Sequence, residues 1–165
     1  MSAVLARRWI GVILLVIALD QLTKAYFHTQ FQPGERVNVL PFFDWILTYN
    51  TGAAFSFLAT AGGWQRWFFV ALAIVVSAWC WRWLNRERDV RIQLALALII
   101  GGAIGNVIDR LWLGKVIDFV LVYWAPWHWY YPAFNVADSA ISVGAVLMLW
   151  SAFFAARHDE GAPRT

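Results

Sequence analysis

The sequence has little charge and almost no cysteine. Only 14% of its 165 residues are charged, whereas 61% are hydrophobic, and the mean hydropathy is +0.58. This composition excludes an ordinary soluble protein. The single cysteine, Cys80, excludes an internal disulfide, and its position between Trp79 and Trp81 in an apolar run favours plain packing.

Motifs for several common chemistries are also missing. The three histidines, at positions 28, 128 and 158, are scattered, and no His-Glu-x-x-His pair predicts a metal site. No Gly-x-Ser-x-Gly turn supports a serine nucleophile of that kind. The net charge of +3 is not gathered into a basic patch with exposed stacking aromatics, which excludes nucleic acid as a partner.

The sequence does contain long hydrophobic runs. Four of them are near the ~20 residues that a helix needs to cross the hydrocarbon core, at about 9–27, 64–83, 92–112 and 136–156. We therefore predict an all-α integral membrane protein, with residues 1–165 forming a single polytopic membrane domain. Asp20–Lys24 interrupts the region where a signal-peptide cleavage site would lie, so we expect the first helix to be retained.

The arginines and lysines of the short loops predict the orientation. Eight basic residues lie on one side, against three in the opposite loops, Arg36, Arg66 and Lys115. We expect both termini to be cytoplasmic and residues 28–63 and 113–135 to face outward. Eight tryptophans near the predicted boundaries are typical of an aromatic belt, at positions 9, 64, 67, 83, 112, 124, 127 and 129.

The two outer segments differ in character. Partial alternation over Phe43–Tyr49 predicts a half-buried strand, and the small apolar run Ala53–Phe57 follows the turn at Asn50–Gly52. A small extracytoplasmic β-sheet is therefore expected in the first segment. The second is expected to form an extracytoplasmic loop, in which the aromatic stretch Trp124–Pro132 suits the membrane interface or covers a site that excludes water.

Polar residues inside the hydrophobic runs are the best candidates for function, since such groups are costly in a membrane. Asp20 and Lys24, four residues apart, form either a local ion pair or a pair that orients a site. Gly101 and Gly105 favour close helix packing. Asn106 and Arg110 lie on one stripe of the third helix, where a buried arginine needs a carboxylate or a lipid phosphate. We expect Asp109 to face outward or to have an interfacial role.

Two aspartates stand in short polar islands, Asp118 and Asp138. We expect them at the same end of two hydrophobic helices, with Asn135 as the N-cap of the last helix. An acidic residue in the first turn of a helix also complements the helix dipole, which is the structural alternative for Asp138. Two carboxylates in one pocket share a proton, which leaves one free to activate water. The sequence therefore favours aspartate-based hydrolysis.

Two other functions fit the same residues. Buried carboxylates with a lysine and an arginine also suit a small proton-coupled transporter, although four helices are few and no inverted repeat is evident. A non-catalytic scaffold that binds a partner helix through its polar stripe is the third hypothesis.

Together the polar islands resemble the lipoprotein signal peptidase family, also called signal peptidase II. The matching stretches follow the family order and cover nearly the whole chain: Asp20–Lys24, Asn50–Ser56, Gly101–Asn106 with Arg110, Val116–Phe119 and Phe134–Ile141. The resemblance implies an intramembrane aspartyl endopeptidase of the bacterial cytoplasmic (inner) membrane. Such enzymes remove the signal peptide from diacylglyceryl-modified prolipoproteins and cut just before the lipidated cysteine.

The resemblance also implies roles for individual residues. Asp118 and Asp138 would be the catalytic pair, and eight residues would shape the site or hold the substrate: Asp20, Lys24, Asn50, Gly52, Asn106, Arg110, Asn135 and Ala137. Because water supplies the nucleophile, we expect neither a metal nor an organic cofactor. The expected partners are prolipoprotein substrates and membrane lipid, with no obligate protein partner.

Overall fold

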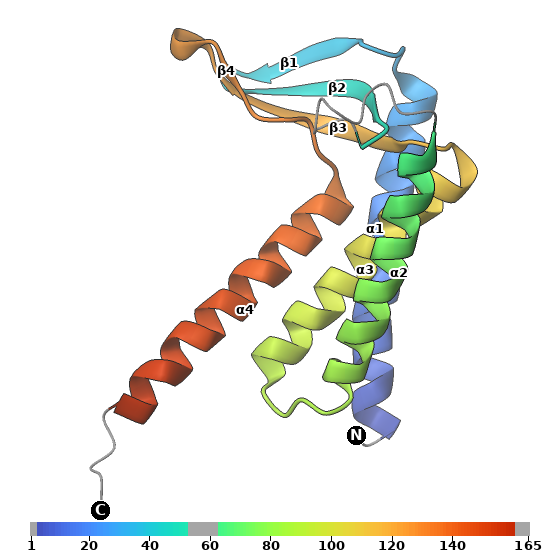
Figure 1. Ribbon diagram of the computed structural model, residues 1–165. Helices are drawn as coiled ribbons and strands as arrows, with labels where there is room; N and C mark the ends of the chain where they lie inside the picture. The colour runs from blue at the N-terminus through green and yellow to red at the C-terminus, as the bar shows by residue number, and fades with distance from the viewer. Residues whose placement is uncertain (1–2, 53–62, 161–165) are drawn as a thin grey trace, which may run out of the picture.

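The computed structural model describes residues 3–52 and 63–160, which form four helices and a four-stranded sheet (Figure 1). The helices are α1 (Ala3–Gln30), α2 (Trp64–Leu84), α3 (Val90–Trp112) and α4 (Val136–Glu160). The strands are β1 (Arg36–Leu40), β2 (Phe43–Asn50), β3 (Val116–Trp124) and β4 (Trp129–Tyr130), with a short 3₁₀ helix, η2 (Ala125–Trp127), before β4. The expected run Ala53–Phe57 lies outside the described residues.

All four helices are long and apolar enough to cross a membrane. Helix α3 is the centre of the bundle and packs against each of the other three. Within its membrane span 67% of the residues are buried, whereas no more than 28% are buried in the other spans. The apolar surfaces of α1, α2 and α4 therefore face outward, as lipid contact requires. Helix α1 begins at Ala3, so Arg7 and Arg8 lie inside the helix and not before it.

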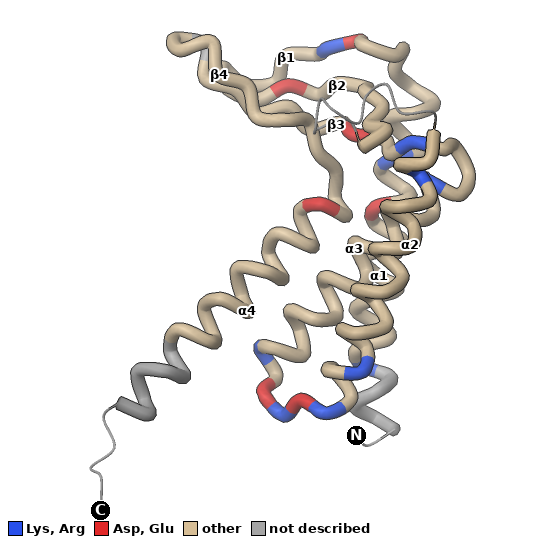
Figure 2. Tube along the Cα trace, in the orientation of Figure 1, with Lys and Arg blue, Asp and Glu red and all other residues tan. Residues whose placement is uncertain are grey.

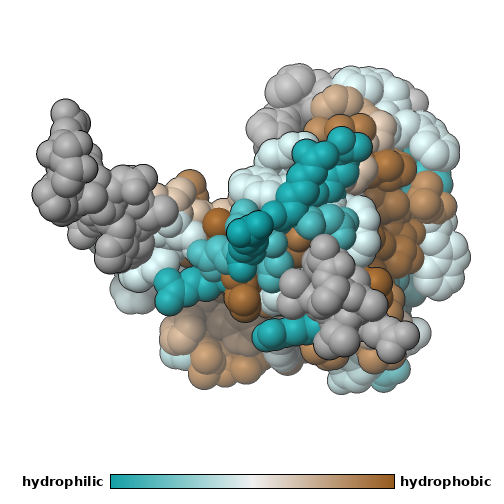
Figure 3. Space-filling view, turned by 90° about the horizontal axis from the view of Figure 1, so that it is seen from below, coloured by the Kyte–Doolittle hydropathy of each residue, from teal (hydrophilic) through white to brown (hydrophobic). Residues whose placement is uncertain are grey.

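Charged residues gather at the two ends of the bundle, and most of the helix length between them is uncharged (Figure 2). Helix α1 begins and α4 ends at the end opposite the sheet (Figure 1). Hydrophilic residues cover this end around the α2–α3 loop (Figure 3), which carries Arg86, Glu87, Arg88 and Asp89. The loop ends at Asp89, which caps α3 and accepts a hydrogen bond from the Arg91 N–H at 2.7 Å.

Small residues bring the helices close together. A Cβ at Gly101 would lie 2.8 Å from Val16 of α1, and one at Gly102 would lie 2.3 Å from the Ala137 carbonyl of α4. The packing role predicted for the glycines of α3 is therefore confirmed. Cys80 is buried in the apolar core between α1, α2 and α3, as predicted. Trp9 is also buried there and donates to Gln93, so it does not belong to an outward-facing aromatic belt.

The sheet covers the other end of the bundle, and its antiparallel strands follow the order β1-β2-β3-β4. Its apolar face rests on the end of α1, where Phe27 stacks on Phe119 of β3 with ring centroids 4.4 Å apart. The predicted strand over Phe43–Tyr49 is confirmed as β2. Val116–Trp124 of the second outer segment forms the longest strand of the sheet, which was not predicted from the sequence. Gly114, with φ of 76°, turns the chain from α3 into that strand.

Candidate active site

The polar residues selected from the sequence meet where α1, α3 and α4 approach the sheet. Asp118 lies on β3, six residues beyond the end of α3, and not at a helix end as expected. Asp138 lies in the first turn of α4, as predicted. The other eight come from every neighbouring element: Asp20 and Lys24 from α1, Asn106 and Arg110 from α3, Asn50 and Gly52 from β2 and the turn after it, and Asn135 and Ala137 from the start of α4.

Asn135 joins the two aspartates. Its side-chain amide donates to Asp118 Oδ1 at 2.7 Å, and its backbone N–H donates to Asp138 Oδ2 at 3.3 Å. Its Oδ1 also accepts from the Asp138 N–H at 2.9 Å, so it is the N-cap of α4, as predicted. Among the described contacts the two carboxylates make no direct hydrogen bond with each other. Asn135 therefore fixes the position of both carboxyl groups.

The two carboxyl groups line different cavities. Asp118 lines a cavity of about 340 Å³ below the end of β2, together with Asn50 and the Pro132–Ala133 segment. Asp138 lines a second cavity of about 280 Å³, which Tyr131, Phe134 and residues of α4 complete. The 131–134 segment contributes to both cavities, and Phe134 pairs with Val120 of β3. Each of the two carboxyl groups is therefore open to a cavity of its own.

The surroundings of Asp118 favour its neutral form. The carboxyl group is buried, and burial together with the negative charge of Asp138 raises the pKa of Asp118 to about 7. Hydrogen bonds from Asn50 and Asn135 oppose this increase, because they stabilise the carboxylate. At neutral pH Asp118 can therefore hold a proton or release it.

Asp138 has its own set of donors. Besides the Asn135 N–H, the Asn106 amide donates to Asp138 Oδ1 at 2.7 Å. Arg110 donates to the backbone carbonyl of Asn106 at 3.3 Å, and its positive charge interacts with both Asp138 and Asp118. The half-buried Arg110 thus acts on the carboxylates through its charge, and a carboxylate was one of its two predicted partners.

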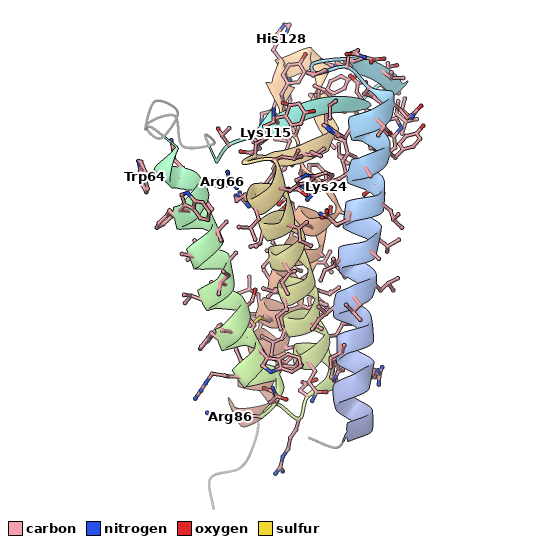
Figure 4. All side chains as sticks on the ribbon, turned by 90° about the vertical axis from the view of Figure 1, so that its right-hand side faces the viewer. Lys24, Trp64, Arg66, Arg86, Lys115 and His128 are labelled. Carbon is pink, nitrogen blue, oxygen red and sulfur yellow. The ribbon has the colours of Figure 1, made fainter. Side chains whose placement is uncertain are left out.

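Lys24 orients Asn106 from the opposite side. The ammonium donates to Asn106 Oδ1 at 3.0 Å, so the other end of that amide, its NH₂ group, points to Asp138. Lys24 also forms ion pairs with Asp20 at 2.8 Å and with Asp109 at 2.9 Å, all three side chains being buried. Figure 4 shows Lys24 directed from α1 into the bundle. The pair Asp20–Lys24 is therefore both an ion pair and a support of the site.

Asp20 ties α1 to the start of α4. Its Oδ1 accepts a hydrogen bond from the Ala137 N–H at 2.9 Å. Ala137 is fully buried, and a Cβ at Gly105 would lie 3.3 Å from its methyl group and 2.6 Å from Asp20 Oδ2. Small residues at 105 and 137 therefore allow this contact between three helices.

Gly52 closes the site on the side of α2. Its φ is 92°, and a Cβ there would lie 2.3 Å from the Phe69 ring. Its N–H donates to Asn50 Oδ1 at 2.7 Å, which holds the Asn50 side chain in place. Residues 53–56 of the Asn50–Ser56 motif lie outside the described residues.

The prediction that Asp109 faces outward was wrong. Asp109 is buried and binds Lys24, Gln21 and the backbone N–H of Ile117, the residue before Asp118. It lies four residues after Gly105 and eight after Gly101, on the stripe of α3 that faces α1. That spacing could have identified Asp109, and a partner for the buried Lys24 is the second clue.

No group of three or more His, Cys, Asp or Glu side chains is placed to hold a metal ion within residues 3–52 and 63–160. The arrangement instead offers two carboxyl groups of unlike environment, three amides and two cations. Such a set can bind a peptide carbonyl, activate water and return a proton to a leaving group.

Comparisons with known proteins agree on one family. The family model for signal peptidase (SPase) II matches residues 12–154. The chain is 50% identical over 157 residues to a lipoprotein signal peptidase of Pseudomonas aeruginosa strain UCBPP-PA14, covering 93% of this chain and 92% of that one. It is 49% identical over 155 residues to one from Pseudomonas syringae pv. tomato, covering 92% and 89%.

Solved structures give the same result for the fold. A bacterial membrane enzyme solved by the in meso method at 2.3 Å resolution matches with a TM-score of 0.81 and 25% identity, covering 96% of this chain and 94% of that one. A second such enzyme, solved at 1.9 Å, matches with a TM-score of 0.77 and 27% identity, covering 87% and 91%. These matches give the transporter hypothesis no support. The chain belongs to the signal peptidase II family, the lipoprotein signal peptidases, and is a membrane-embedded protease.

Proposed function

We propose that Asp118 and Asp138 are the catalytic pair with which this chain cleaves diacylglyceryl-modified prolipoproteins just before the lipidated cysteine. The observation that carries this proposal is the bridge that Asn135 makes between the two carboxyl groups. The bridge lies at the sheet end of a bundle whose helices are long enough to span a membrane. The scissile bond of a lipid-anchored substrate reaches this depth from the side, out of the bilayer.

The environments of the two aspartates support a different role for each. Asp118, whose pKa is raised to about 7, keeps its proton and donates a hydrogen bond to the scissile carbonyl oxygen. Asp138 accepts hydrogen bonds from Asn106 and Asn135, as a carboxylate does, and takes a proton from the attacking water. The water oxygen forms the new bond to the carbonyl carbon. The proton on Asp138 then passes to the nitrogen as the C–N bond breaks.

The remaining polar residues support these two steps. Asn50 and Asn135 hold Asp118, while Asn106, oriented by Lys24, holds Asp138. The positive charge of Arg110 offsets negative charge that develops between the aspartates. Asp20, Gly52 and Ala137 fix the backbone around them. Water is the nucleophile, so neither a metal nor an organic cofactor takes part in this scheme.

The same proposal includes an orientation. The described side chains at the end opposite the sheet include five arginines, at 8, 82, 86, 88 and 91, whereas the sheet end carries fewer free cations. By the positive-inside rule, both termini are cytoplasmic and the aspartates lie toward the outer face of the inner membrane. Substrate and lipid are the partners, with no obligate protein partner.

The test uses the purified chain with a diacylglyceryl-modified prolipoprotein and, as a matched substrate, the same prolipoprotein without its lipid. Mass spectrometry of the products locates the cut. We expect cleavage directly before the modified cysteine, with the lipidated substrate preferred. Cleavage at another bond, or equal turnover of both substrates, would contradict the proposed specificity.

A further inference from the structure

A second cationic site lies at the sheet end of α2, around Arg66. The side chain turns back across the space between α2 and α3 (Figure 4), where Nη2 donates to the Leu111 carbonyl at 2.8 Å. Nη1 lies against Gly114, since a Cβ there would be 3.4 Å away. The Trp67 ring covers the guanidinium at 4.9 Å. Arg66 is therefore held in one place and does not simply extend into solvent.

The held guanidinium has unused hydrogen-bonding capacity. Its Nε is buried and has no hydrogen-bond partner among the described residues. None of the ion pairs among the described residues includes Arg66 or the nearby Lys115, whose ammonium lies 3.6 Å from the Tyr49 ring centroid. An arginine and a lysine that have no carboxylate partner among the described residues can pair with an added anion.

A cavity adjoins Arg66, and Lys115 follows Gly114, one of the residues that line this cavity. Its volume is about 500 Å³, and Thr51, Gly114 and the first turn of α2, residues 63–67, line it. No acidic residue is among those lining residues. Gly63, the N-cap of α2, provides no side chain to the N–H groups of that turn, which adds donors to the cationic ones. The cavity is thus large enough for a phosphate ester, and its lining provides hydrogen-bond donors and positive charge for one.

The position of the cavity relative to the membrane indicates which kind of phosphate it binds. It lies at the end of a membrane-spanning helix, and Trp64 and Trp67 beside it are both more than half exposed. Exposed tryptophans at the end of a span mark the headgroup level of a bilayer. We propose that Arg66 and Lys115 bind the phosphate group of a phospholipid in the cavity between the α2 N-terminus and Gly114.

The test measures lipid binding by the purified full-length chain in detergent, with native mass spectrometry as the readout. The probes are phosphatidylglycerol, diacylglycerol with the same acyl chains, and inorganic phosphate. The variants are Arg66→Gln and Lys115→Gln, and Arg86→Gln at the other end of α2 is the matched control (Figure 4). Thermal unfolding of each variant reports on its fold, and Lys115→Gln removes no hydrogen bond to the backbone.

We expect the phosphatidylglycerol dissociation constant to rise about tenfold in Arg66→Gln and several-fold in Lys115→Gln. It should not change in Arg86→Gln, and diacylglycerol should bind all four proteins alike. An equal loss of phosphatidylglycerol affinity in Arg86→Gln would contradict the proposed site. So would unchanged affinity in both Arg66→Gln and Lys115→Gln. If inorganic phosphate displaces phosphatidylglycerol at low concentration, the cavity binds a soluble phosphate, and the proposal of a phospholipid ligand is contradicted.

Discussion

Asn135 and Asp138 form a reciprocal cap at the start of α4, in which the side chain of each accepts from the backbone N–H of the other. The Asn135 side chain accepts from the Asp138 N–H at 2.9 Å, and the Asp138 side chain accepts from the Asn135 N–H at 3.3 Å. The sequence offered a choice between a dipole role and a catalytic role for Asp138, and this reciprocal box shows that the residue has a structural role in any case. Oδ2 of Asp138 accepts from the backbone at the start of α4, and Oδ1 accepts from the Asn106 amide.

The capping box predicts different stabilities for two substitutions of Asp138. In Asp138→Asn the amide oxygen can still accept from the Asn135 N–H, so the cap of α4 is kept and only the hydrogen bond from the Asn106 amide is lost. Asp138→Ala loses that acceptor and should cost about 1 kcal/mol. Unfolding temperatures in one detergent measure the difference. Equal stability of the alanine and asparagine variants would contradict the capping role.

The raised pKa of Asp118 predicts the pH dependence of cleavage. Because the proposed role of Asp118 requires its proton, kcat/KM should fall as the pH rises through about 7. Asn135→Ser keeps an N-cap but cannot reach Asp118, and it removes a hydrogen bond that lowers the pKa of Asp118. The falling limb should then move to higher pH.

A pH–rate profile of kcat/KM for the parent and Asn135→Ser measures this displacement. Asn38→Ser, a change on β1 away from Asp118 and Asp138, is the control and should leave the falling limb of the profile at the same pH. A limb that stays in place or moves to lower pH in Asn135→Ser would refute the assignment of the proton to Asp118.

The close contact of α3 with α4 predicts the effect of a single methyl group. A Cβ at Gly102 would lie 2.3 Å from the backbone oxygen of Ala137, so Gly102→Ala must displace the start of α4. Overpacking of this kind costs about 1–3 kcal/mol. Since Asp138 follows Ala137, the displacement also moves Asp138, and kcat should fall even for the fraction of the variant that is folded.

Gly11→Ala is the matched control for that substitution. No atom lies within 4 Å of a Cβ at Gly11, and alanine favours a helix by about 1 kcal/mol. Its unfolding temperature should equal or exceed that of the parent, with unchanged turnover. If Gly102→Ala behaves like Gly11→Ala in both measurements, the close contact does not position Asp138.

The buried cluster around Lys24 predicts a large loss of stability. Lys24→Met leaves Asp20 and Asp109 buried without their cation, and removing one partner of a buried ion pair costs about 3–5 kcal/mol. Lys24→Met combined with Asp109→Asn removes one of the uncompensated charges and should recover part of the loss. Unfolding temperatures of the single and double variants give the comparison. A double variant less stable than Lys24→Met would contradict this account of the cluster.

The membrane helices could be predicted from the sequence because their signal is local. Twenty apolar residues in a row specify a spanning helix without knowledge of any partner, and all four were found. The site motifs were predicted in the same way, through short polar islands in apolar surroundings. Asn135 as N-cap depends only on the residues next to it in the chain, and it too was found.

The features that were missed depend on distant residues. Strand β3 pairs with β2, and Thr48 lies opposite Asp118, a register that joins positions seventy residues apart. No local pattern around Val116–Trp124 shows that partner, and the strand was not predicted. Asp109 was misplaced because its partner Lys24 lies on another helix, although its spacing from Gly101 and Gly105 was a local clue.

The central claim is that Asp118 and Asp138 together perform the cleavage. Single-turnover cleavage of a diacylglyceryl-modified prolipoprotein by purified Asp118→Asn and Asp138→Asn tests it most directly, with Asp89→Asn as the control because asparagine also caps α3 there. The account predicts parental rates for Asp89→Asn and a loss of at least about 10³-fold in each of the other two, all three proteins remaining folded. Substantial cleavage by either folded variant would contradict it.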